Sequence, residues 1–194
     1  MDYWILAEDS RDGGVIDAYP RGSPDDYLFD EAVPLAKEFP PDAAVRFSRN
    51  FPQARKLEDF QPNTLDALIV SRKVRELLDG LGVRNAEYLP VALKDHQNQV
   101  VAPDYAILNL LGGEPAIDPS ASVVRMNALD KDQISAIEKL VLDRKAISPD
   151  AKIFRCTAMR RLFMIRDDVK AAFEKAGLTG YRLFAADGWD GHDY

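Results

Sequence analysis

Two segments of the chain carry the same pattern: a short apolar run, an amphipathic helix that ends near a glycine, and a second apolar run. Val74 in the first helix precedes Val169 in the second by 95 residues, and Gly82 precedes Gly177 by the same interval (169 − 74 and 177 − 82). Glycine suits the left-handed residue that ends many helices. The pattern predicts two repeated strand–helix–strand units, with two independent amphipathic helices as the alternative. The units cover residues 68–91 and 163–184.

Further apolar and β-branched runs around the two units are typical of strands. Strands together with two helices predict an α+β fold with a mixed or mostly antiparallel sheet and the helices packed on that sheet. The apolar stripes of the helices are then core and not binding surface. We expect one domain over residues 1–194, divided into an acidic N-terminal part, a core and an acidic aromatic tail at 1–60, 61–185 and 186–194. The other expected strands are 3–7, 15–19, 43–47, 105–111, 123–126, 139–142 and 153–156.

The composition is that of a soluble globular protein, since 46% of the 194 residues are hydrophobic and 29% are charged. No apolar run reaches the roughly 20 residues that cross a bilayer, and residues 1–9 lack the basic start of a secretory signal. We therefore expect a cytoplasmic protein with no membrane partner. One cysteine, Cys156, and two histidines are too few for an internal disulfide or a usual structural zinc site. No metal and no cofactor is expected.

Acidic residues exceed basic ones, 32 to 25, which gives a net charge of −7. The excess is concentrated in residues 1–60, which hold 13 acidic and 7 basic side chains, against 19 and 18 in residues 61–194. Proteins that bind nucleic acid through its phosphates normally present a basic face, so nucleic acid is not an expected partner. An acidic N-terminal third would instead attract a basic partner. The alternative is that the charge serves solubility alone.

Three acidic pairs and the C-terminal tail are the segments most suited to contact a basic protein. Aromatic side chains beside acids are typical of protein-binding surfaces, and the tail contains both. For Trp189 the alternative is that the ring packs back on the domain, and for the acidic pairs that they are solvated surface. The candidate residues are Asp25, Asp26, Asp30, Glu31, Glu58, Asp59, Trp189, Asp190 and Tyr194.

Motifs of known enzyme classes, such as GxGxxG, GxSxG and HExxH, are absent from the sequence. Asp95 and His96 lie in a run of polar turn formers, which is typical of a solvated hairpin tip, and Cys156 follows a strand pattern that predicts a buried thiol. For an enzyme with a site assembled from scattered residues, these three would be the first candidates to test. Arg160 and Arg161 are expected in a hairpin turn that faces water, with anion binding as the alternative. A weak metal site in the tail, which is not expected, would need Asp190, His192 and Asp193.

A series of short runs in the last two thirds of the chain carries a family likeness. The runs are Leu68-Ile69-Val70-Ser71, Glu87-Tyr88-Leu89-Pro90-Val91, Tyr105-Ala106-Ile107-Leu108-Asn109, Leu140-Val141-Leu142-Asp143, Ile153-Phe154-Arg155 and Gly177-Leu178-Thr179-Gly180-Tyr181-Arg182-Leu183-Phe184. With them the chain resembles a family of bacterial immunity proteins, immunity family eleven, formerly a domain of unknown function. The resemblance spans most of residues 60–185, whereas the first 60 residues match only through the opening strand.

The resemblance implies a protein that is encoded beside a secreted or contact-delivered toxin and protects the producing cell by binding that toxin. It implies no catalysis and no active-site residues. A nuclease is the kind of toxin found near members of this group, and an acidic surface would suit the basic groove of such an enzyme. The expected mechanism is occlusion of the toxin's active site. A small cytoplasmic enzyme and a scaffold or regulatory binding domain are the alternatives.

Overall fold

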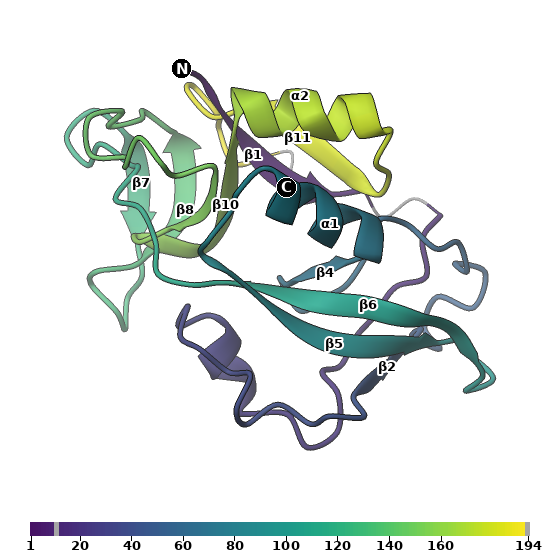
Figure 1. The fold of residues 1–194 in the computed structure, drawn as a ribbon. Helices are drawn as coiled ribbons and strands as arrows, with labels where there is room; N and C mark the ends of the chain where they lie inside the picture. The colour runs from purple at the N-terminus through teal and green to yellow at the C-terminus, as the bar shows by residue number, and fades with distance from the viewer. Residues whose placement is uncertain (10–11, 193–194) are drawn as a thin grey trace.

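The computed structural model describes residues 1–9 and 12–192, in which eleven strands, two α-helices and one 3-10 helix are found (Figure 1). The strands are β1 (Tyr3–Glu8), β2 (Ala44–Arg46), β3 (Phe60–Gln61), β4 (Leu68–Val70), β5 (Ala86–Lys94), β6 (Val100–Leu110), β7 (Val123–Met126), β8 (Ile134–Lys139), β9 (Ile153–Cys156), β10 (Met159–Arg166) and β11 (Tyr181–Ala185). The helices are η1 (Asp26–Phe29), α1 (Arg72–Gly80) and α2 (Asp167–Ala176). Neither α-helix of this described part is long and apolar enough to cross a bilayer.

Nine of the strands form two larger sheets. The four-stranded sheet has the order β11-β1-β10-β9 and is antiparallel throughout. The five-stranded sheet has the order β2-β5-β6-β4-β3 and is mixed, because β2 runs parallel to β5 while the other pairs are antiparallel. β7 and β8 form a separate antiparallel hairpin. An α+β fold with mixed and antiparallel sheets is therefore confirmed.

Each α-helix follows one strand and precedes another, since α1 stands between β4 and β5 in the sequence and α2 between β10 and β11. The two strands that flank a helix are not neighbours in their sheet. β6 lies between β4 and β5, β1 lies between β10 and β11, and each middle strand is antiparallel to both neighbours. The N-terminal strand β1 therefore completes the sheet that carries the C-terminal helix.

Both α-helices bury one face because their apolar residues recur at helical spacing. Val74 and Leu78 of α1 are fully buried, as are Val169 and Phe173 of α2. Gly177 follows α2 with a φ of 59°, a left-handed conformation that glycine adopts without strain. The helical faces expected from the sequence are thus core.

A central apolar cluster joins the two larger sheets. It contains the buried faces of both helices together with Phe60 and Leu108 from the five-stranded sheet and Phe163 from the four-stranded sheet. The ring centroid of Phe60 lies 5.4 Å from that of Phe173 in α2, so the two halves touch directly. Figure 1 shows α1 over β4 and β6, and α2 alongside β1 and β11.

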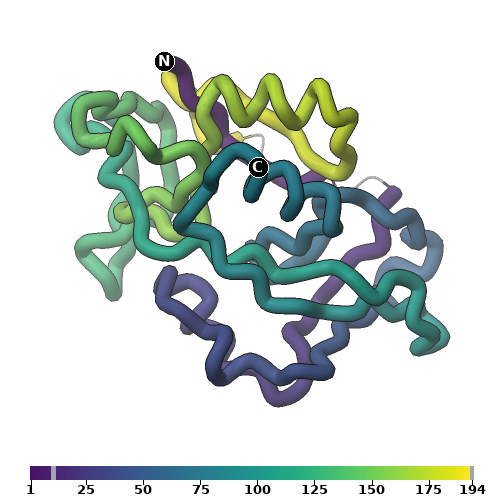
Figure 2. Tube along the Cα trace, in the orientation of Figure 1, coloured from purple at the N-terminus to yellow at the C-terminus, as the bar shows by residue number. Residues whose placement is uncertain are grey.

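Two further apolar clusters cover the outer faces of these sheets. The N-terminal segment 15–47 covers the far face of the five-stranded sheet through residues such as Ile16, Phe29 and Leu35, and Figure 2 shows its purple and blue trace running below that sheet. Segments 116–147 and 186–189 contribute to a cluster with Tyr3 and Phe154 of the four-stranded sheet. Both outer faces are covered largely by segments without regular secondary structure.

Two expected strands are wrong. Residues 15–19 make only isolated bridges, from Ile16 to Phe47 and Asn63, because this segment fills the core as a loop and not as a hairpin arm. In the run 139–142, Lys139 is the last residue of β8, and residues 140–142 form no strand beyond an isolated bridge from Leu142 to Ile117. The backbone of this run is held by the C-terminal tail, since Leu140 N donates to Trp189 O at 2.8 Å. Burial against the tail thus explains the apolar character of that run.

Candidate functional site

Asp30 and Glu31 directly follow η1 and face the start of β10. Arg160 Nη1 donates to Glu31 Oε1 at 2.7 Å, and Arg161 Nη2 donates to Asp30 Oδ2 at 2.9 Å. Arg161 Nη1 also donates to Asp66 Oδ2 at 2.8 Å. Charge-assisted hydrogen bonds therefore join residues that are 129 and 131 positions apart in the sequence.

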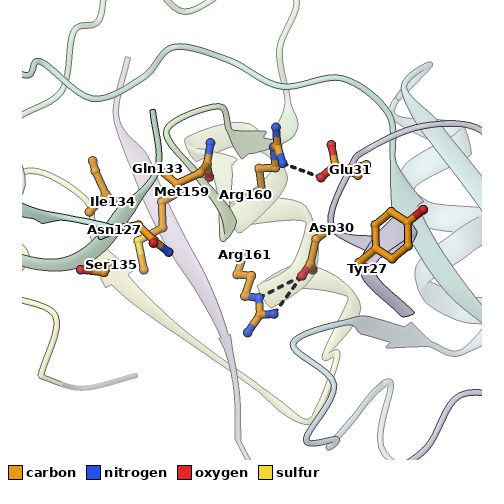
Figure 3. Close-up of a pocket in the computed structure, with 10 residues that line it drawn as sticks. All are labelled: Tyr27, Asp30, Glu31, Asn127, Gln133, Ile134, Ser135, Met159, Arg160 and Arg161. Carbon is orange, nitrogen blue, oxygen red and sulfur yellow. Dashed lines mark hydrogen bonds and ion pairs between the residues drawn. The ribbon is translucent and has the colours of Figure 1, made fainter. Parts of the chain in front are cut away.

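These ion pairs lie in the middle of an open cavity of about 530 Å³. Tyr27 from η1 stands on one side, and Asn127, Gln133 and Ser135 from the β7–β8 hairpin stand on the other, with the two arginines between them (Figure 3). Three parts of the fold meet here: the N-terminal segment, the four-stranded sheet and the separate hairpin. No single stretch of sequence contains this site.

Arg160 and Arg161 belong to β10, so their expected place in a hairpin turn is wrong. The turn is formed by Thr157 and Ala158. β10 begins at Met159, which pairs with Cys156 of β9, and the register of this pairing shifts between Met159 and Phe163. Both arginine side chains stay partly exposed, at 36% and 58%. Although burial lowers the pKa of Arg161, the hydrogen bonds and charges of its two carboxylate partners raise it. The guanidinium groups thus serve to hold acids in place.

Exposed aromatic and apolar side chains near this cavity were missed by sequence reasoning. Tyr27 is 62% exposed, Met126 44% and Leu129 97%. Leu129 lies in the loop 127–133, whose two ends line the cavity. The available signal was a lone leucine among asparagine and aspartate turn formers, which is typical of a loop tip. Asp25 and Asp26, next to Tyr27, are also exposed, so the candidate acids of the N-terminal part gather here.

The third acidic pair does not line this cavity and holds other elements together. The Glu58 side chain is buried and pairs with Lys56 Nζ at 2.6 Å. Asp59 accepts hydrogen bonds from Ser71 Oγ at 2.7 Å and from Thr179 N at 3.1 Å. Asp59 therefore ties the end of the segment before β3 to the start of α1 and to the turn after α2. These contacts are structural.

The tail packs on the domain. Trp189 is 7% exposed and belongs to the apolar cluster over the four-stranded sheet, so of its two expected roles the packed one is observed. Asp190 is exposed and accepts a hydrogen bond from His192 N at 3.1 Å. Asp193 and Tyr194 lie outside the described residues. Among the residues described, no group of three or more histidine, cysteine or carboxylate side chains is placed to hold a metal ion.

The three residues of the enzyme alternative do not come together. Asp95 Oδ1 accepts the backbone N–H groups of Gln97 and Gln99, which closes the β5–β6 turn. His96 Nε2 lies 3.1 Å from a backbone carbonyl oxygen in the neighbouring loop. Cys156 is fully buried in β9 of the other sheet, and burial raises its pKa to about 12. A thiol that stays protonated and lies on another sheet forms no nucleophile–base pair with this histidine.

A second, smaller cavity of about 290 Å³ contains a perturbed carboxylate. Glu8 accepts hydrogen bonds from the backbone N–H of Asn63 at 2.8 Å and from the Asn63 side-chain amide. Burial raises the pKa of Glu8 to about 8, the charge of Asp66 adds to this, and the bonds from Asn63 oppose it. Asn63 also bridges β1 to the loop before β4 through Ala67 O at 2.8 Å. The arrangement joins the two sheets.

Comparison with known protein families identifies a match. The sequence matches the immunity protein family (Imm11) over residues 8–187, which is nearly the whole chain. No match is found among curated proteins. The match includes η1, the β7–β8 hairpin and β10, which together form the larger cavity. Because the family model matches far more than half of the chain, the chain belongs to the Imm11 family of immunity proteins.

Proposed function

We propose that this protein is an immunity protein that binds a cognate toxin and neutralises it by covering the toxin's active site, with no reaction catalysed. Membership of the immunity family over residues 8–187 is the observation that carries the proposal. That membership supports a role in toxin immunity and a toxin as partner. Occlusion is supported by a folded surface that combines exposed acids, arginines and apolar side chains, the composition of many protein interfaces.

The proposed partner is a toxin domain with a basic surface, of which a nuclease is the leading example. The net charge of −7 and the acidic residues 1–60 support this choice, because opposite charges speed the encounter of two proteins. The N-terminal acids Asp25, Asp26, Asp30 and Glu31 are proposed contacts, together with Asp190 in the tail. Glu58 and Asp59 are engaged within the fold and Trp189 is buried, so they are no longer proposed.

The protein is proposed to act in the cytoplasm of the producing cell, as one folded unit over residues 1–194. The central cluster, which draws side chains from both larger sheets, supports a single unit. The two strand–helix–strand units are proposed to share a common plan. Strand order supports this. β5, β6, β4 and β3 lie side by side in one sheet in the same order as β11, β1, β10 and β9 in the other. In each unit the helix follows the third strand of this order and precedes the first.

Co-expression tests the proposed function. The toxin domain encoded beside this chain is produced in a sensitive host, with and without the full-length protein. We expect growth to be rescued by this chain and not by an unrelated immunity protein, and we expect a 1:1 complex in size-exclusion chromatography with light scattering. Absence of both rescue and complex would refute the proposal.

Stoichiometry separates binding from catalysis. If the protein only occludes the toxin, residual toxin activity falls linearly with the amount of immunity protein added and reaches its minimum at one equivalent. A catalyst that modifies or degrades the toxin would inactivate many equivalents over time. Time-dependent loss of activity at a tenth of an equivalent would therefore contradict the non-catalytic mechanism.

A further inference from the structure

We infer that the cavity between η1 and the β7–β8 hairpin is the part of the surface that receives the toxin, and that it takes a lysine or arginine side chain which the toxin presents among apolar neighbours. The inference rests on the proposed function and specifies where and how the partner is bound. Unused acceptor atoms, local charge and exposed apolar side chains around one cavity support it.

Each of the two carboxylates in this cavity has one oxygen that accepts no hydrogen bond from the described residues. Asp30 Oδ2 accepts two N–H groups of Arg161, and Glu31 Oε1 accepts one from Arg160. Within the part of the chain that the structure describes, no hydrogen bond reaches Asp30 Oδ1 or Glu31 Oε2. The two acidic side chains are 25% and 40% exposed. Since an ionised carboxylate offers about four lone-pair sites, each can accept a further donor.

Local charge selects a cation as the occupant. The segment 25–31 and the hairpin loop 127–133 together carry six acids, whereas the two arginines and one lysine supply three positive charges, which leaves a net charge of −3. A carboxylate or phosphate from a partner would add to this excess. A lysine or arginine would reduce it, and its N–H groups match the unused oxygens. The residues counted are Asp25, Asp26, Asp30, Glu31, Asp130, Asp132, Arg160, Arg161 and Lys131.

The arginines hold the acids before any partner arrives. Figure 3 shows Arg160 and Arg161 between the η1 side chains and the hairpin side chains, with Glu31 and Asp30 each joined to one of them. A carboxylate that is already ordered loses little conformational freedom on binding. Tyr27 stands on the same side of the cavity, and its ring can receive a cation on its face.

Exposed apolar side chains supply the water-excluding surroundings that a buried ion pair needs. Leu129 and Met126 lie on the hairpin, and Tyr27 lies across the cavity from it. Tyrosine and methionine are enriched at protein interfaces, and side chains around a central contact act mainly by excluding water. A toxin loop with a basic residue between apolar ones fits this combination.

Three exposed positions test the inference in the full-length protein. The variants Tyr27→Ala, Leu129→Glu and Glu31→Gln are titrated against the toxin domain encoded beside this chain. Val100→Glu is the matched control, because Val100 is 56% exposed at the β5–β6 turn, on the other side of the molecule from the β7–β8 hairpin in Figure 1. Thermal denaturation is recorded for each variant, so that loss of binding is scored only for proteins that melt like the wild type.

Tyr27→Ala and Leu129→Glu are expected to weaken binding by about 30-fold each, the effect of losing an interface hot spot. Glu31→Gln keeps the size of the side chain and removes its charge. We expect about tenfold weaker binding and a smaller dependence of affinity on salt concentration. Val100→Glu is expected to bind within about twofold of the wild type.

The outcomes separate this inference from the proposed function. If the wild type binds and the three cavity variants bind equally well, the toxin docks elsewhere and the inference is wrong while the proposed function stands. If Glu31→Gln alone leaves affinity and salt dependence unchanged, the cation is not bound here, which also overturns the inference. If the wild type does not bind the toxin domain, the proposed function fails and the inference with it.

Discussion

The contact between the two larger sheets can be tested by shortening one side chain, Phe173→Ala. Phe173 is fully buried in α2, and its ring centroid lies 5.4 Å from that of Phe60 and 5.6 Å from that of Tyr181. Replacement of a buried phenylalanine by alanine costs about 3–5 kcal/mol, from lost transfer free energy and the cavity left behind. The loss of two ring contacts places this site in the upper half of that range.

Urea denaturation measures this cost. A domain stability of about 5–15 kcal/mol leaves the variant folded in buffer. With a slope of about 2 kcal/mol per molar urea, a loss of about 4 kcal/mol lowers the midpoint by about 2 M. Far-UV circular dichroism and tryptophan fluorescence should report the same single transition in the wild type if both sheets unfold together.

Leu129→Ala is the control for this measurement, because Leu129 is 97% exposed and its removal should change the free energy of unfolding by less than about 0.5 kcal/mol. Two results would refute the reasoning. A change below about 1 kcal/mol for Phe173→Ala would mean that the ring is not packed between the sheets. Separate transitions by the two optical probes in the wild type would mean that the sheets are independent folding units.

Three further predictions concern polar groups that are buried or partly buried. Because burial raises the pKa of Glu8 from 4.5 to about 8, the folded protein holds this proton more tightly than the unfolded chain, so the stabilisation is complete below pH 4.5 and is lost as the pH rises to about 8. The melting temperature of Glu8→Gln should therefore increase relative to the wild type across that range, and a constant difference would contradict the assignment. Cys156 should not react with a disulfide reagent in the native protein and should react fully in denaturant; rapid labelling of the native protein would show that β9 opens. Asp59→Ala removes the acceptor for Ser71 and Thr179 and should cost about 1–3 kcal/mol in the same urea assay, whereas an unchanged midpoint would mean that these bonds add nothing.

Local periodicity explains what the sequence could predict. The helical spacing of Val74 and Leu78, and of Val169 and Phe173, identified both helices and their buried faces. The polar turn formers around Asp95 located the β5–β6 turn correctly. In each case the signal lies within one element, because burial of one face imposes a period on neighbouring residues.

Pairings between distant segments could not be predicted in the same way. β1 is inserted between β10 and β11, and nothing in residues 3–8 marks those partners. The segment 15–47 is rich in proline and acidic residues, yet it supplies Ile16, Phe29 and Leu35 to the core. A loop that covers a sheet has no repeating pattern, because its contacts follow the shape of the surface beneath it and not a regular backbone geometry.

Only part of the candidate site could be predicted from the sequence, because its residues come from segments that lie far apart in the chain. Asp30 and Glu31 could be chosen from local acidity, but their arginine partners lie 129 and 131 positions away and were assigned to a solvated turn. This pairing changes how the acids can act. Two of the four acids at residues 25–31 are matched by Arg160 and Arg161, so the local field there is weaker than the acid count suggests.

Long-range attraction of a basic toxin then depends on the net charge of the whole chain, −7, while recognition depends on the geometry of the cavity. Partly exposed ion pairs of this kind contribute about 0–1 kcal/mol to folding, so they are poorly explained as stabilising contacts. They are better explained as positioning contacts that fix two carboxylates beside Tyr27, with one oxygen of each left for a partner. Raising the salt concentration should therefore slow association with the toxin more than it speeds dissociation, since screening acts on the long-range field and little on a contact from which water is excluded.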